Sequence, residues 1–204
     1  SEEDNVEVHR KEFENPKTSL DHVEIGEKID SINFDDATKV VGPRFVVLKN
    51  KLAQMHRALI QLMLDEAMKN NYQECYVPHI VNSNSLFGTG QLPKFAEDSF
   101  KIENDEKYLI PTAEVPLTNL FRDKQLTPNE LPVMVTAHTP CYRSEAGSYG
   151  KDTKGMIRQH QFEKVELVQI VHPSSSNNAL NSLISHASSI LDMLEISYRH
   201  VELC

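Results

Sequence analysis

The sequence predicts an α+β fold in which an antiparallel β-sheet is flanked by helices. Two strand-like segments, residues 131–145 and 157–171, are joined by a short glycine-bearing loop, which predicts an antiparallel hairpin. Two long segments with apolar residues at helical spacing, 44–69 and 174–194, lie before and after this hairpin. The 204 residues are 39% hydrophobic and 25% charged, which is enough for one domain with a substantial core.

The N-terminal residues 1–20 are polar and acidic, which predicts a linker or N-terminal extension ahead of a folded domain at 21–204. The helix predicted over 44–69 follows a break at Gly42-Pro43. Its apolar stripe could face the core of the domain or a second subunit, and the spacing alone leaves both possibilities open. The stripe consists of Leu48, Leu52, Met55, Leu59 and Leu62.

The remaining elements follow from local patterns. The segment ECYVPHIVN at 74–82 predicts a strand, in which Pro78 favours an edge or a bulge because proline has no N–H to donate. Residues 82–100 predict a surface loop with short turns, and residues 107–121 a short strand followed by a turn or helix start. The serines at 174–176 can cap the final helix, and residues 196–204 predict one more strand.

The composition excludes several classes of protein. A net charge of −9 excludes an overall basic surface, so a nucleic-acid partner would need a local patch. No stretch approaches the roughly 18 apolar residues of a membrane span. Cys75, Cys141 and Cys204 are widely spaced, which predicts neither a disulfide framework nor a zinc site but a reducing, cytoplasmic setting. The nine histidines show no metal-ligand spacing, so no protein metal site is expected.

The predicted hairpin gathers charged and aromatic side chains. Alternation places Arg158, Phe162 and Glu166 on one face of the second strand, and Arg143 and Glu145 on one face of the first. If these faces coincide, the surface combines arginines for phosphate, an aromatic ring for a nucleobase and carboxylates for an ammonium group. The same residues could equally form solvated salt bridges across the strands.

The loop between the strands holds three of the seven glycines in the chain, Gly147, Gly150 and Gly155. Glycines are usual in turns, and they also let a backbone bend sharply beside a ligand.

The hairpin segment YRSEAGSYGKDTKGMIRQHQFEKVE, residues 142–166, resembles motif 2 of class II aminoacyl-tRNA synthetases, in the form of the seryl-tRNA synthetase family. PTAEVPLTNL at 111–120 and GTGQLPKF at 88–95 are similar to other strings of that family. GPRFVVLKNKLAQMHRALIQLML at 42–64, with YVPHIV at 76–81, is similar to motif 1.

The resemblance runs from about His22 to Cys204 and implies a partial class II catalytic domain. It implies ATP-dependent activation of L-serine to seryl-adenylate and transfer of serine to the 3′ end of serine tRNA. It also implies Mg²⁺ on the triphosphate and a homodimer formed through motif 1. Relative to the family, the chain lacks an N-terminal coiled-coil arm and motif 3, which puts the activity of the chain on its own in question.

The resemblance also implies roles for single residues. Arg143 and Arg158 are the implied catalytic residues at the phosphates, and Phe162 is implied to stack on adenine. Glu166 is implied to hold the ammonium or hydroxyl of serine, and the loop 146–157 to face the acceptor end of tRNA. The implied ATP ligands are Arg143, Ser144, Glu145, Arg158 and Phe162, and the implied serine ligands are Thr112, Ala113, Glu114 and Glu166.

Two alternatives share the resemblance. The first is a non-catalytic, synthetase-like binding module. The intact residues Thr112, Arg143, Glu145 and Glu166 argue against it. The second is a relative that aminoacylates a carrier protein. Such relatives resemble the zinc-dependent branch of the family, whose Cys and His ligands have no counterpart here.

Overall fold

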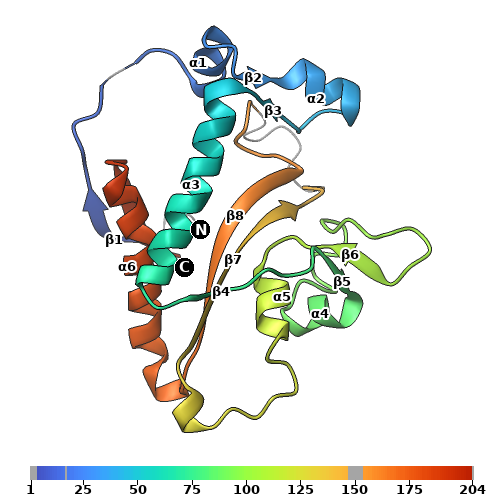
Figure 1. The fold of residues 1–204 in the computed structure, drawn as a ribbon, viewed down its shortest axis with the longest axis vertical. Helices are drawn as coiled ribbons and strands as arrows, with labels where there is room; N and C mark the ends of the chain where they lie inside the picture. Colours follow the sequence, from blue (N-terminus) through green and yellow to red (C-terminus); the bar gives the residue numbers. More distant parts are fainter. Residues whose placement is uncertain (1–3, 17, 147–153, 204) are drawn as a thin grey trace. The chain divides into compact units, whose positions relative to one another are not determined.

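The structure, a computed structural model, describes residues 4–16, 18–146 and 154–203. Its helices and strands mix without a regular βα repeat, so the expected α+β class is confirmed (Figure 1). The chain forms two compact units, residues 20–173 and residues 1–19 with 174–204. The longer elements in chain order are β1 (Val6–Lys11), α1 (His22–Lys28), α2 (Phe34–Val40), α3 (Asn50–Lys69), α4 (Ser83–Gly88), α5 (Glu114–Asn119), β7 (Val133–Tyr142), β8 (Gln161–Ile170), α6 (Ser176–Met193) and β9 (Tyr198–Glu202). The shorter strands are β2 (Ile32–Asn33), β3 (Val47–Leu48), β4 (Gln73–Glu74), β5 (Ile80–Asn82) and β6 (Lys107–Leu109).

The smaller unit joins the two ends of the chain. Strand β1 pairs with β9 in antiparallel fashion, with Lys11 opposite Tyr198, and Lys11 Nζ lies 2.8 Å from Asp192 Oδ1 of α6. Residues 1–20 are therefore not a linker throughout, as their composition predicted. Their polarity gave no sign of a strand because the pairing partner lies at the far end of the sequence. The expected final strand and the helix after Pro173 are both present.

The larger unit is built on a three-stranded sheet with the order β4-β7-β8. β7 and β8 pair in antiparallel fashion with Cys141 opposite Phe162 and Ala137 opposite Glu166, so the expected hairpin is confirmed. β4 adds to β7 in parallel, which makes the sheet mixed rather than purely antiparallel. Both hairpin strands are shorter than predicted at the connecting end, because β7 ends at Tyr142 and β8 begins at Gln161. Glu145, inside the first predicted strand, has φ +52°, a value incompatible with extended backbone.

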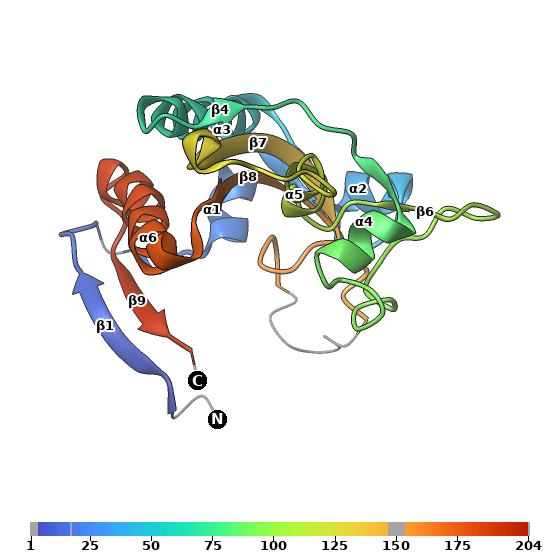
Figure 2. The same ribbon diagram turned by 90° about the horizontal axis from the view of Figure 1, so that it is seen from below.

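The two faces of the hairpin carry different elements. On the face of Glu166, α5 packs into a buried apolar cluster of Val77, Ala113, Leu117, Val135 and Ala137. On the opposite face α3 runs along the hairpin (Figure 2), and Gln169 of β8 donates a 2.6 Å hydrogen bond to the hydroxyl of Tyr72, just beyond the helix. The face of the sheet that bears Glu166 is therefore the one against which α5 and the segment before it pack.

The long helix starts later than predicted. Residues 44–49 do not begin α3, because Val47 and Leu48 pair with Asn33 and Ile32 and the N–H of Lys49 donates to the carbonyl of Ser31. The predicted stripe is only partly buried within the chain, since Met55 is 52% exposed while the buried residues of α3 are Leu64 and Ala67.

Two further expectations change around Pro78. The single strand predicted over 74–82 is divided into β4 and β5, which pair with β7 and β6 respectively. Pro78 lies in the crossing between these two sheets, where no ladder hydrogen bond from its nitrogen is needed. The loop predicted over 82–100 contains the helix α4, which Asn82 caps by accepting from the N–H of Ser85.

Candidate functional site

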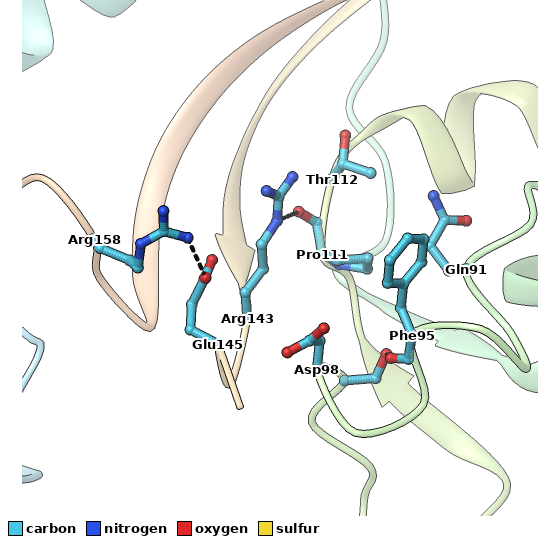
Figure 3. Close-up of a pocket in the computed structure, with 9 residues that line it drawn as sticks. Gln91, Phe95, Asp98, Pro111, Thr112, Arg143, Glu145 and Arg158 are labelled. Atoms are coloured by element: carbon cyan, nitrogen blue, oxygen red, sulfur yellow. Dashed lines mark hydrogen bonds and ion pairs between the residues drawn. The ribbon is translucent and has the colours of Figure 1, made fainter. Parts of the chain in front are cut away.

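A cavity of about 320 Å³ lies between the connecting end of the hairpin and the segment 91–112 (Figure 3). It combines two guanidinium groups, two carboxylates and one aromatic ring with backbone and hydroxyl groups. The lining residues are Gln91, Phe95, Asp98, Ser99, Pro111, Thr112, Arg143, Glu145 and Arg158. Three of the predicted ATP ligands, Arg143, Glu145 and Arg158, therefore converge on one cavity, together with one predicted serine ligand, Thr112.

Arg143 follows the last residue of β7 and enters the cavity between the two walls. Its backbone continues the ladder, because its N–H donates to the carbonyl of His160 at 2.9 Å. Its Nε donates to the carbonyl of Pro111 at 3.2 Å, and its guanidinium lies 5.2 Å from the ring centroid of Phe162. These contacts orient the planar group, and its two Nη atoms have no hydrogen-bond partner within the described part of the chain. They are well placed to bind an anion.

Arg158 and Glu145 form an ion pair across the ends of the hairpin, with Nη1 2.8 Å from Oε2 (Figure 3). The side chain of Glu145 is 17% exposed, so the pair is shielded more than an ordinary surface salt bridge. Arg44 contacts both ends of the hairpin loop. Its carbonyl accepts from the N–H of His160 at 3.0 Å, and its Nη1 donates to the carbonyl of Glu145 at 3.4 Å. The cross-strand salt bridge that the sequence allowed is therefore present, and its two residues also line the cavity.

A second polar cluster adjoins the cavity through Thr112. The Thr112 hydroxyl donates to Glu166 Oε2 at 2.6 Å, and Lys164 Nζ lies 2.7 Å from the same oxygen. Glu114, the first residue of α5, is near these groups. Partial burial of its carboxyl and, second, the negative charge of Glu166 raise the pKa of Glu114. Two carboxylates beside one hydroxyl form a site suited to an ammonium group.

Besides Glu114 and Glu166, three further predicted ligands lie apart from the cavity wall. Phe162 lines a separate groove of about 520 Å³ with Phe45 and Gln159, although Arg143 connects it to the cavity. The Ser144 hydroxyl donates to the carbonyl of Glu97 and is thereby engaged within the protein. Ala113 is fully buried in the core against β7, so its contribution to a ligand would be through the backbone.

Several residues of the site were missed by the sequence reasoning. Asp98 accepts the N–H of Ala146 through Oδ1 at 2.8 Å and the N–H of Ser144 through its carbonyl at 2.9 Å, which fixes the outgoing end of the hairpin loop. Lys164 shared the predicted face of β8 but had no assigned role. The predicted contact of the loop 146–157 with tRNA falls mostly on residues 147–153, which lie outside the described residues, as do Gly147 and Gly150.

Within the ranges that the structure describes, no group of three or more His, Cys, Asp and Glu side chains is arranged to hold a metal ion. Over the same ranges, none of the helices has the length and apolar character needed to cross a lipid bilayer.

Comparison with known proteins gives a consistent result. The family model described as tRNA synthetase class II core domain (G, H, P, S and T) matches residues 97–204. The serine--tRNA ligase of Francisella tularensis subsp. novicida is 57% identical over 209 residues, covering 100% of this chain and 49% of that relative. That of Cellvibrio japonicus is 56% identical over 210 residues with the same coverage. The chain thus spans about half the length of the curated relatives it matches.

Solved structures agree. The crystal structure of seryl-tRNA synthetase from Pyrococcus horikoshii complexed with ATP superimposes with a TM-score of 0.93 at 30% identity, over 100% of this chain and 50% of that one. The cytoplasmic serine-tRNA ligase of Naegleria fowleri in complex with AMP gives a TM-score of 0.90 at 29% identity, over 98% and 49% of the two chains.

The raised pKa of Glu114 leads to a prediction about stability and pH. The folded protein holds this proton more tightly than the unfolded chain, so the contribution of Glu114 to the free energy of unfolding falls as pH rises above the unfolded pKa of about 4.3. We expect Glu114→Gln to raise the urea midpoint at neutral pH, and the gain to shrink towards about pH 4, where the wild-type carboxyl is also neutral.

Glu103→Gln, at an exposed position, is the matched control and should show neither effect. A Glu114→Gln variant that is less stable than wild type at neutral pH would contradict the electrostatic account of this site.

Proposed function

The chain belongs to the class II tRNA synthetase core family, and from this premise we propose that the protein activates L-serine with ATP and transfers it to serine tRNA. One observation carries the proposal. Thr112 lines the cavity that holds Arg143 and Arg158, and it also donates to Glu166 at 2.6 Å. A single residue therefore joins a phosphate-binding surface to an ammonium-binding one, as the mixed anhydride of an amino acid and AMP requires.

The ATP half of the site is carried by the hairpin. Arg143 binds the α-phosphate, since its fixed guanidinium presents two Nη atoms towards the cavity. Arg158 assists at the phosphates, and Glu145 holds it in place. Phe162 offers its ring to adenine beside Arg143, at the junction of the cavity and the neighbouring groove. Ser144 contributes indirectly, because its hydroxyl donates to the carbonyl of Glu97 and its N–H to the carbonyl of Asp98, which holds the strand end that carries Arg143 and Glu145.

The serine half lies at the start of α5 and the middle of β8. Glu166 and Glu114 bind the ammonium group of serine, and the Thr112 hydroxyl, which Glu166 orients, completes the polar wall. Ala113 supplies backbone only. One carboxylate of this pair can also accept the hydroxyl of serine, and alanine, which lacks a hydroxyl, would leave that acceptor without a partner at a cost of roughly 1–3 kcal/mol.

Mg²⁺ fits this site as an ion held mainly by the ATP phosphates. Glu145 and Asp98 are the carboxylates on the cavity wall, and a magnesium site of this kind needs only one or two protein carboxylates beside the phosphate oxygens. When bound, the ion neutralises phosphate charge.

The residues then position two reactions. The serine carboxylate attacks the α-phosphorus of ATP; the new O–P bond forms as the bond to pyrophosphate breaks. A terminal ribose hydroxyl of tRNA next attacks the carbonyl carbon, forming the ester and releasing AMP. Arg143 stabilises the charge that develops on the α-phosphate, and the fixed geometry of the site supplies much of the remaining acceleration. The unpaired thiols Cys75 and Cys141 fit a cytoplasmic setting for this reaction.

Serine-dependent ATP–pyrophosphate exchange by the full-length protein tests the ATP half. We expect Arg143→Ala to lower the exchange rate by on the order of 10²–10³, because one preoriented charge contact with the transition state is lost. Arg122→Ala, an exposed arginine outside the cavity, is the control and should exchange at the wild-type rate. Near-normal exchange by Arg143→Ala would reject the assignment of the α-phosphate site.

The same assay separates the serine half from the ATP half. We expect Glu166→Ala to raise the KM for serine by roughly 5- to 150-fold while the KM for ATP changes little, since the lost group contacts the amino acid only. Glu166→Gln keeps the acceptor for Thr112 and separates loss of charge from loss of packing. Equal rises in both constants would show that Glu166 is not a serine ligand.

A homodimer formed through α3 and the strands around Pro78 completes the proposal. The stripe predicted from sequence stays partly exposed within the chain, and Met55, at its centre, is 52% exposed. Light scattering on the full-length protein should give a dimer for wild type and for Gln54→Asp, which lies off the stripe. Met55→Asp should weaken association, and a wild-type monomer at micromolar concentration would be inconsistent with this interface.

A further inference from the structure

A contact outside the cavity joins the start of α1 to the returning end of the hairpin loop. The N–H of Met156 donates to His22 Nε2 at 2.9 Å, and Lys154 forms an ion pair with Asp21, the N-cap of α1. The Lys154 ammonium, followed by the backbone N–H of Glu24, lowers the pKa of Asp21 to about 2. These two contacts join segments more than a hundred residues apart in the sequence.

Gly155 shows how closely the two segments approach. Its φ is +62°, and a Cβ at this position would lie 2.1 Å from His22 Nε2 and 2.6 Å from Val23 Cγ2. The backbone therefore passes directly against the first turn of α1, at a distance that only glycine allows. This is the one glycine of the loop that the described residues include, and its conformation is tied to His22.

The contact lies two residues before Arg158. From Met156 the chain reaches Arg158, which pairs with Glu145, and two residues later the N–H of His160 donates to the carbonyl of Arg44. The backbone that carries Arg158 is thus held on both sides. At Met156 the hydrogen bond is supplied by His22, and at His160 the N–H donates to the carbonyl of Arg44 while the carbonyl accepts from the N–H of Arg143, which continues the β7–β8 ladder.

We propose that His22 is a positioning residue for Arg158, acting through the backbone of Met156, and that it sets the affinity of the site for ATP. The inference rests on the proposed function. His22 lies outside the cavity wall. Its Nε2 accepts the hydrogen bond from the backbone N–H of Met156.

The hydrogen bond between Met156 and His22 is solvent-exposed. Its loss therefore changes the position of the returning end of the hairpin loop more than it changes the stability of the fold. In pyrophosphate exchange by the full-length protein, we expect His22→Leu to raise the KM for ATP roughly three- to tenfold. The KM for serine should change less than about twofold, because the serine ligands belong to α5 and β8. The melting temperature should stay at the wild-type value.

His22→Gln is the rescuing variant, since its amide oxygen can take the place of Nε2 as acceptor, and it should restore the KM for ATP. Lys28→Leu, exposed on the same helix, is the control for a surface change. Hydrogen exchange provides a second readout: the Met156 amide should exchange faster in His22→Leu than in wild type and His22→Gln.

The outcomes separate the two proposals. If wild type shows serine-dependent exchange but His22→Leu leaves the KM for ATP unchanged, or raises both constants equally, the positioning role is overturned while the proposed function stands. Unchanged protection of the Met156 amide in His22→Leu would also overturn it. If wild type shows no serine-dependent exchange, the proposed function fails, and the role of His22 in ATP affinity fails with it.

Discussion

The site depends on the antiparallel register of β7 and β8. With Ala137 opposite Glu166 and Cys141 opposite Phe162, the side chains of Phe162 and Glu166 lie on the face of the sheet against which α5 packs. Because side chains alternate along a strand, a slip of one residue would turn Phe162 and Glu166 towards α3. The Thr136 hydroxyl, which donates to the carbonyl of Glu166 at 2.8 Å, adds a side-chain contact to this register.

Segments distant in sequence hold the side chains of the candidate site in place on the β7–β8 hairpin. Thr112 connects the two halves of the site, Arg44 and Asp98 hold the outgoing end of the hairpin loop, and His22 holds the returning end. Each of these hydrogen bonds contributes only a small amount to net stability, about 0.5–1.5 kcal/mol in typical cases. Their larger effect is on geometry, because a displacement of about 1 Å at a reacting centre can cost on the order of 10²-fold in rate.

The sequence predicted those parts whose signals are local. Strand alternation and a turn define the hairpin, and the string around Thr112 defines the short strand before it and the helix after it. The strand at Val6–Lys11, the late start of α3 and the division at Pro78 depend on partners far along the chain, which composition and periodicity do not report. In the site, motif similarity located Arg143, whereas the roles of Asp98 and His22 arise only from long-range contacts.

A crystal structure of the full-length protein with a non-hydrolysable sulfamate analogue of seryl-adenylate would test the central claim most directly. The account predicts the ammonium group within hydrogen-bond distance of Glu166, the group that replaces the α-phosphate beside the Nη atoms of Arg143, and adenine against the ring of Phe162. An analogue bound elsewhere, or bound with its ammonium group directed away from Glu166 and Thr112, would contradict the claim that Thr112 joins one continuous serine-activating site.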